Sequence, residues 1–226
     1  MTDRTRPSSV QHPPAPPGEK PRARPAVASM ASGAPRLQGL PPLVDAHTRV
    51  LVLGSFPGAA SLAAQQYYGH PRNRFWPVMA HVFQAFLATG AHPISLECYE
   101  FDEVGVPRTY PQRCQWLRAH GVGLWDVYAA CQRPGSLDAD IRAAEPNDLA
   151  GLLARCPRLR GVAHNGSTSA RHAHHTQALA QTVFGPQGVA VVTLPSTSPA
   201  NATWRLDRLQ AAWADALVPL LHGAGG

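Results

Sequence analysis

The sequence predicts an α/β fold: a three-layer sandwich in which a four-stranded, mainly parallel central sheet is covered by helices on both faces. Two observations lead to this prediction. From residue 41 onward, short apolar runs of strand length alternate with longer segments whose apolar residues recur at helical spacing. The strand runs are nearly continuous in apolar residues, which is typical of strands that are buried on both faces.

Each element is justified by its own pattern. Four apolar runs are the expected strands, at residues 49–53, 122–127, 159–163 and 189–194. Helices are expected over residues 73–87, over 112–120, from a cap at Asn147 to residue 155, over 167–184, and at the end of the chain. The expected core positions of the first and last helices are Phe75, Trp76, Met79, Val82, Phe83, Phe86, Leu206, Leu209, Trp213, Leu217 and Leu220.

Residues 1–40 are predicted to form a disordered tail that is rich in proline and arginine, ahead of one domain at residues 41–226. The tail has no aromatic residue, and such a segment cannot bury enough apolar surface to offset the entropy lost on ordering. It holds six Lys and Arg against two Asp and Glu, whereas the domain holds fourteen against twelve. Most of the net charge of +6 therefore belongs to the tail, and the charge alone is a weak indication of nucleic-acid binding.

The composition argues against several kinds of chemistry. The only lysine, Lys20, lies in the tail, so neither a phosphate-binding P-loop lysine nor a Schiff-base lysine is expected in the domain. No two cysteines form a C-x-x-C pair, and the His172-Ala-His174-His175 cluster is better explained as a solvated helix face, so no metal and no cofactor is expected. No apolar run reaches the length of about 18 residues that a membrane span needs. We expect a reduced, monomeric, cytoplasmic protein that does not bind membranes.

In a parallel sheet, ligands bind beyond the carboxyl ends of the strands. The first expected strand is followed by residues 54–58 and then by residues 67–76, which read YYGHPRNRFW. Aromatic rings beside an amide, a histidine and two arginines suit stacking on a base and contact with phosphates. The alternative is that the aromatic residues belong to the core and that Asn73 caps a helix.

Two further loops follow the later strands. Asn165 could present its amide to a ligand, or could serve only the turn before Gly166. Residues 196–201 precede the last helix, and free N–H groups and hydroxyls at a helix start form a natural phosphate site. The alternative for Ser198 and Asn201 is ordinary helix capping.

Taken together, four segments resemble the uracil-DNA glycosylase superfamily, and more narrowly its hypoxanthine-DNA (deoxyinosine) glycosylase branch. They are LVLGSFPGAASLAAQQYYGHPRNRFW (51–76), GLWDVYAACQRPGSLDADI (123–141), VAHNGSTS (162–169) and LPSTSPANA (194–202). The HPRNRFW stretch also resembles the mismatch-specific uracil/thymine branch. The resemblance implies base excision from DNA that contains deaminated bases, by hydrolysis of the N-glycosidic bond after the nucleotide has rotated out of the duplex.

The resemblance also implies site residues. Many superfamily members take a water-positioning Asp or Asn from the first motif, but that position here is Phe56, which cannot hold a water. The hypoxanthine branch offers Asn73 as the catalytic residue, with His70 acting in its place or orienting it. Asp126 and Asp138 are interpreted as capping or supporting residues.

For base binding, the resemblance implicates Tyr68 in stacking, Asn165 in reading, and Ser55 and Phe56 beside them. Hypoxanthine and uracil share an edge, an N–H donor next to a carbonyl acceptor, whereas adenine presents the reverse order and would clash with a fixed amide. The expected DNA contacts are Arg72, Arg74, Ser196, Ser198, Pro199, Ala200 and Asn201. Within this set, Pro199 and Ala200 are the expected wedge, and one of the two arginines could be structural instead.

Three alternatives remain open at this point. The base could be uracil, or thymine opposite guanine, because the shared edge does not separate these from hypoxanthine. Phe56 at the usual water site leaves room for a DNA-damage binder without catalytic activity. An unrelated doubly wound enzyme that acts on small molecules is the third alternative. Without a lysine in the domain, an active enzyme is expected to be monofunctional and to leave an intact abasic site.

Overall fold

The central sheet has four parallel strands, as predicted. The computed structural model describes residues 35–90, 99–135 and 137–222. The sheet order is β3-β2-β6-β7, and every neighbouring pair is parallel. The strands are β2 (Val50–Gly54), β3 (Val122–Asp126), β6 (Gly161–Asn165) and β7 (Ala190–Leu194).

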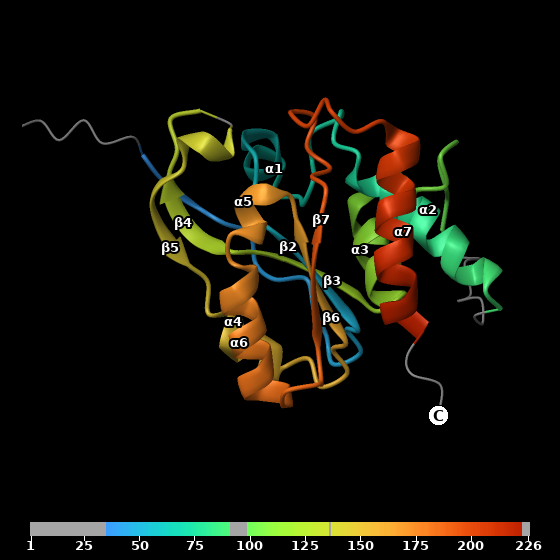
Figure 1. Cartoon of the computed structure of the whole chain (residues 1–226). Coiled ribbons are helices and arrows are strands. Elements are labelled where there is room, and N and C mark those ends of the chain that lie inside the picture. Colours follow the sequence, from blue (N-terminus) through green and yellow to red (C-terminus); the bar gives the residue numbers. More distant parts are fainter. Residues whose placement is uncertain (1–34, 91–98, 136, 223–226) are drawn as a thin grey trace, which may run out of the picture. The chain divides into compact units, whose positions relative to one another are not determined.

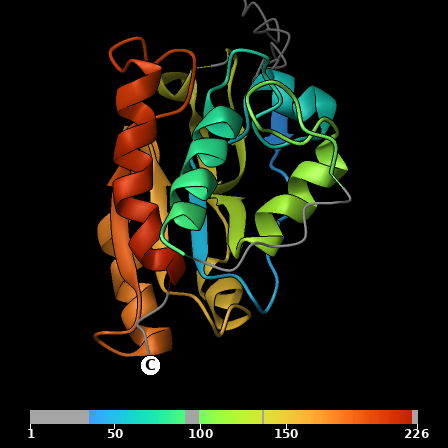
Figure 2. The same cartoon turned by 90° about the vertical axis from the view of Figure 1, so that its right-hand side faces the viewer.

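Helices cover both faces of this sheet, which confirms the three-layer sandwich (Figures 1 and 2). One face carries α2 (Phe75–Ala88), α3 (Tyr110–Ala119) and α7 (Leu206–His222); the other carries α4 (Leu149–Ala154) and α6 (Ala173–Phe184). Successive residues of β2 face opposite ways: Val50 and Val52 belong to the core under α2 and α7, whereas Leu51 and Leu53 belong to the core under α4 and α6. This double burial explains why the strand is apolar throughout.

Some predicted helices differ from the observed ones. The expected helix at 167–184 is interrupted, giving α5 (Ser167–Ala170) and then α6. The cap of α4 is Asp148, whose carboxylate accepts the Gly151 N–H, so the prediction of Asn147 is wrong. The Asn147 amide instead donates to the backbone oxygen of Asp126 at 2.8 Å. All six predicted core positions of α2 are buried, whereas Leu206 at the start of α7 is exposed.

A second, antiparallel sheet was not predicted. Its order is β1-β4-β5, formed by β1 (Arg36–Gln38), β4 (Tyr128–Gln132) and β5 (Arg142–Pro146). Because β5 is fully exposed and β1 has three residues, neither gives a hydrophobic pattern. The folded domain thus begins at Arg36 or earlier, ahead of the predicted boundary; residues 1–34 of the predicted tail lie outside the described residues. None of the helices that the structure describes is long and apolar enough to cross a membrane.

Candidate active site

A cavity of about 830 Å³ lies at the carboxyl ends of the parallel strands. It is bordered by the loops that follow β2, β6 and β7, which meet at the upper edge of the sheet in Figure 1. Every residue that the sequence pointed to as a site residue lines this cavity, except Arg74. The residues so brought together are Ser55, Phe56, Tyr68, His70, Arg72, Asn73, Asn165, Ser196, Ser198, Pro199, Ala200 and Asn201.

Asn73 lies two residues before α2, and its amide is oriented by the start of this helix. Its Oδ1 accepts the N–H of Phe75, the first residue of α2, at 2.9 Å, although the N-cap residue of this helix is Arg74 and not Asn73. Its Nδ2 has no hydrogen-bond partner among the described residues and is left to donate. The neighbouring His70 accepts the Arg72 N–H on Nδ1 at 3.1 Å, which places the proton of the neutral ring on Nε2.

Tyr68 and Asn165 form a hydrogen-bonded pair at one side of the cavity. The Tyr68 ring stacks on Phe75, with centroids 3.8 Å apart, and its backbone has a positive φ of 54°. Asn165 Nδ2 donates to the Tyr68 hydroxyl at 3.2 Å and to Thr197 Oγ1 at 3.0 Å, while its Oδ1 accepts the Thr197 N–H. Burial raises the pKa of the Tyr68 hydroxyl, which therefore keeps a proton to donate. These bonds fix the orientation of the Asn165 amide.

The first motif, residues 54–58 at the end of β2, is held in place by two side chains that follow β4 in the chain. Ser55 donates its hydroxyl hydrogen to Asp138 Oδ2 at 2.7 Å. The guanidinium of Arg133 lies over the Phe56 ring, 5.2 Å from its centroid, and donates to the carbonyl of Pro57 at 2.6 Å. Arg133 is buried and lines the cavity, yet sequence reasoning missed it. Its position in the CQRPGSLD stretch was the only available signal.

Asp126 ends β3 and places a buried carboxyl group at the cavity. The residue is 5% exposed, and its Oδ2 is buried without a hydrogen-bond partner in the part of the chain that the structure describes. Burial and, second, the charge of Asp138 raise the pKa of Asp126 to about 7, while Arg133 opposes this shift. The Asp126 carboxyl group therefore caps no helix in the described chain, whereas Asp138 supports Ser55 through a hydrogen bond.

The third loop, residues 196–201 after β7, forms a turn that is stabilised by hydrogen bonds from its own side chains. Ser196 Oγ accepts the Ser198 N–H at 3.2 Å, and Ser198 Oγ accepts the Ala200 N–H at 3.3 Å. Asn201 Nδ2 donates to the Ser196 carbonyl at 2.8 Å. Pro199 and Ala200 thus sit on a turn that its own side chains keep in shape.

The side chain of Arg74 stabilises this loop through hydrogen bonds to its backbone. Its guanidinium donates to the backbone carbonyls of Ser198, Asn201 and Trp204, so the predicted direct DNA contact is not what its geometry supports. The structural alternative for one of the two arginines applies to Arg74, with carbonyl groups instead of a carboxylate as its partners. Arg72, by contrast, is exposed at the cavity.

Two large apolar side chains at the cavity were not expected from the sequence. Leu137 and Trp204 both line it and are among the exposed large hydrophobic residues of the described chain. Apolar side chains exposed beside a cleft are typical of surfaces that contact another molecule. Neither residue belongs to a periodic pattern, so no sequence signal distinguished them.

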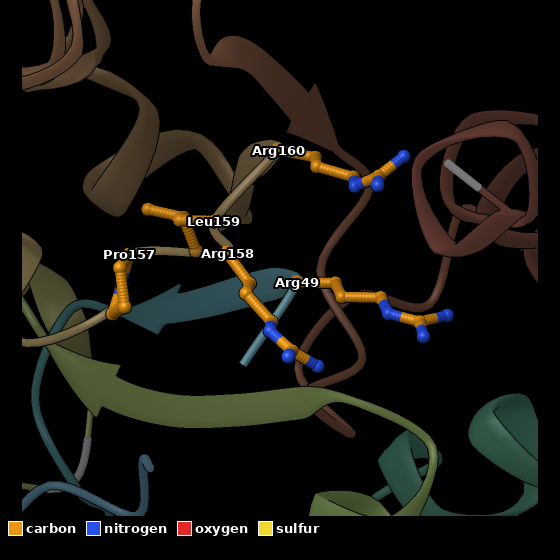
Figure 3. Close-up of a pocket in the computed structure, with 5 residues that line it drawn as sticks. All are labelled: Arg49, Pro157, Arg158, Leu159 and Arg160. Carbon is orange, nitrogen blue, oxygen red and sulfur yellow. The ribbon is translucent and has the colours of Figure 1, made fainter. Parts of the chain in front are cut away.

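A second hollow, of about 370 Å³, lies at the opposite end of the sheet (Figure 3). It is formed by Arg49, immediately before β2, and by residues 157–160, immediately before β6. Arg49 donates to the Leu221 carbonyl at 2.8 Å, and Arg158 contacts His47 Nδ1 at 3.2 Å. The lining contains no carboxylate, thiol or imidazole, so this hollow offers no group for acid, base or nucleophilic chemistry.

The histidine cluster on α6 forms no metal site in the described residues, where no group of three or more His, Cys, Asp or Glu side chains is placed to hold an ion. His172 Nε2 instead lies 2.8 Å from the Tyr128 hydroxyl.

Comparison with known proteins agrees with this architecture. The uracil DNA glycosylase superfamily matches residues 41–217. Two proteins named hypoxanthine DNA glycosylase are each 31% identical: the one from Methanosarcina acetivorans over 76% of this chain and 92% of its own length, and the one from Methanosarcina barkeri over 79% and 96%. The solution NMR structure of a protein from M. acetivorans, described as a candidate uracil DNA glycosylase, is 30% identical, with a TM-score of 0.61 over 83% of this chain and 99% of that one. The chain belongs to the uracil DNA glycosylase superfamily.

Proposed function

We propose that this protein is a monofunctional DNA glycosylase that hydrolyses the N-glycosidic bond of a deaminated base, in the first place hypoxanthine, in base excision repair. The observation that carries the proposal is the cavity, which combines an aromatic residue, two oriented amides and the turn at residues 196–201 in a glycosylase fold. The names of the two Methanosarcina relatives support hypoxanthine as the base. The proposed setting is a cytoplasmic monomer that acts on DNA.

In this proposal the lesion leaves the duplex and enters the cavity next to Tyr68. Stacking on an aromatic ring contributes about 1–3 kcal/mol per base. Asn165 reads the edge of the base, which requires that Nδ2 exchange one present partner, Thr197 Oγ1, for the carbonyl of the base. Ser55 and Phe56 complete the base-binding wall. An amide held in one orientation disfavours adenine because two polar groups would face each other unpaired.

Asn73 stabilises the departing base. Negative charge moves onto the base as the bond to the sugar breaks, and hydrogen-bond donors aimed at that charge accelerate the step. Because Oδ1 of Asn73 is engaged at the start of α2, the available group is the Nδ2 donor. His70 presents a second donor, Nε2–H, from the same turn.

The third loop and Arg72 hold the DNA backbone. The N–H groups of Thr197, Ser198, Ala200 and Asn201 are already bonded, so the turn offers phosphates the hydroxyl hydrogens of Ser196 and Ser198. Pro199 and Ala200 fill the space that the rotated nucleotide leaves. Arg72 adds an exposed positive charge at the same edge.

Uracil, or thymine or uracil opposite guanine, is the second candidate substrate. The likeness to the candidate uracil DNA glycosylase from M. acetivorans favours it, because that structure covers most of this chain. Hypoxanthine and uracil share the edge that Asn165 reads, so the relative rates at which the two bases are released decide between the candidates.

The test compares wild type with Asn73→Ala on matched oligonucleotides that carry deoxyinosine, uracil or a G·T mispair. We expect wild type to release hypoxanthine fastest, and Asn73→Ala to lower its single-turnover rate by about 10²–10³-fold, the usual effect of removing one such donor. Equal rates for the two proteins would refute the role of Asn73. Binding to deoxyinosine DNA without release of any base would indicate a damage binder.

A further inference from the structure

The carboxyl group of Asp126 is the least satisfied acidic group at the cavity. Buried side-chain oxygens nearly always have a hydrogen-bond partner, so an exception calls for an explanation. Asp126 Oδ2 is fully buried and has no partner in the described chain, although the residue lines the cavity. No helix end, backbone N–H or arginine within the described residues donates to this carboxyl group, which is what a capping or ion-pair role would require.

The backbone fixes where this carboxyl group lies. β3 and β2 run parallel, and their register pairs Asp126 with Gly54. A Cβ on Gly54 would overlap with Asp126 Oδ1, so the carboxyl group occupies the space that the missing side chain leaves free. It therefore lies beside Gly54, the residue before Ser55 and Phe56, and all three residues from Gly54 to Phe56 line the cavity with Asp126.

Hydrolysis needs a group that takes a proton from water, and the imidazole and carboxyl groups that line the cavity are those of His70, Asp138 and Asp126. His70 already accepts a backbone N–H on Nδ1, and its other ring nitrogen carries a proton. Asp138 is exposed and accepts a hydroxyl hydrogen from Ser55. Asp126 is buried and accepts no hydrogen bond from the described residues.

We propose that Asp126 is the catalytic base that holds the attacking water and takes its proton. The water oxygen bonds to C1′ of the deoxyribose, and the N-glycosidic bond breaks with its electron pair on the base. The proton released by the water passes to the Asp126 carboxylate, which later returns it to solvent, and the departing base takes a proton from solvent. This inference rests on the proposed function and adds its proton acceptor.

The surroundings adjust Asp126 for this task. Asp138 repels its negative charge, Arg133 attracts it, and the two neighbouring hydroxyls of Tyr67 and Tyr68 stay protonated because burial raises their pKa values. The resulting pKa of Asp126, about 7, lies near neutrality, where a general base works best. As a carboxylate, it also faces the positive charge that develops on the sugar.

The test is the pH profile of single-turnover base release by Asp126→Asn and wild type. For wild type we expect a rate that rises about tenfold per pH unit below pH 7 and is level above it. Asp126→Asn should be slower by about 10²–10⁴-fold at pH 8, and its rate should no longer rise with pH below pH 7, the acidic limb of the wild-type profile. Asn has the same shape as Asp, and thermal melting checks that the variant is folded.

Asp138→Asn is the matched control, since it removes a neighbouring charge and leaves Asp126 in place. It should keep the acidic limb and move it to lower pH, because one cause of the raised pKa is gone. A wild-type-like profile for Asp126→Asn, or a wild-type rate that falls above pH 7, would overturn the inference while leaving the glycosylase function intact. Absence of base release by wild type on every substrate would instead refute the proposed function, and the inference with it.

Discussion

At the scale of single residues, neighbouring side chains of residues 72–74 face in opposite directions. Arg72 and Asn73 face the cavity, whereas Arg74 turns inward and binds three carbonyl groups of the third loop. The sequence predicted both arginines as DNA contacts because it reveals the charge of a side chain and not its direction. Only the fold separates the exposed arginine from the supporting one.

Arg72→Ala should therefore weaken DNA binding through the loss of one phosphate contact. Binding is measured in the Asn73→Ala variant, because its slow reaction leaves the DNA uncleaved. Adding Arg72→Ala to this variant should lower its affinity for a deoxyinosine duplex. The slope of log K against log salt should also decrease in magnitude by about 1. Fluorescence anisotropy between 50 and 200 mM salt (roughly the range in which such contacts dominate) measures both. Arg158→Ala, an exposed arginine at the opposite end of the sheet, is the control and should leave the slope unchanged.

Asp126 and Arg133 show what sequence reasoning could not reach. Asp126 looks like an ordinary strand-end carboxylate, and Arg133 like a surface charge next to a proline. Their importance depends on burial and on missing partners, which result from the packing of β3 and β4. The amides, by contrast, could be placed at the cavity from the sequence because Asn165 ends β6 and Asn73 lies two residues before α2, two elements that the apolar pattern reveals.

At the scale of elements, prediction succeeded where apolar residues form a continuous run or recur at helical spacing. The four strands of the central sheet and the long helices α2 and α7 leave strong apolar patterns, and all were predicted. β5 was not predicted, and α4 was predicted with the wrong capping residue, each for its own reason. The first has no buried residue, and the second depends on a choice between two adjacent capping residues, Asn147 and Asp148.

One buried histidine ties several elements together beneath the cavity. His164 of β6 lies 2.8 Å from Ser169 Oγ on α5 and 3.1 Å from Thr176 Oγ1 on α6. Because Ser169 donates its own hydrogen to the Leu53 carbonyl, it accepts one from His164 Nδ1–H. Nε2 then accepts from Thr176, so the ring is bound in its neutral form. Burial, with a smaller contribution from His172, lowers the pKa of His164 to about 4.

This histidine should make the fold sensitive to acid. Its pKa is about 6.5 in the unfolded chain and about 4 in the folded one, so the unfolded chain binds the extra proton between these values. The stabilisation is complete above pH 6.5 and is lost as the pH falls to 4, amounting to about 3 kcal/mol. Urea unfolding of wild type and His164→Gln across this range measures it as the difference between the two curves. Parallel curves would show that His164 does not titrate as inferred.

At the scale of the whole molecule, the site is assembled where the chain changes direction across the sheet. β2 pairs with β3 on one side and with β6 on the other, and the crevice above such a switch point is the usual ligand site of open α/β folds. The cavity lies above this point and gathers loops that are more than a hundred residues apart. The sequence predicted this meeting place because parallel strands align their carboxyl ends, although it could not predict how the loops pack there.

The absence of lysine from residues 35–226 predicts what product the enzyme leaves. Cleavage of the sugar by β-elimination needs an amine that forms a Schiff base, and residues 35–226 contain no lysine. Incubation with end-labelled deoxyinosine DNA should thus give no strand break until alkali is added, and borohydride should trap no covalent complex of protein and DNA. A bifunctional glycosylase with an active-site lysine is the positive control for both readouts. Strand breakage without alkali, or a trapped complex, would show that an amine reaches the sugar and that the reaction does not stop at hydrolysis.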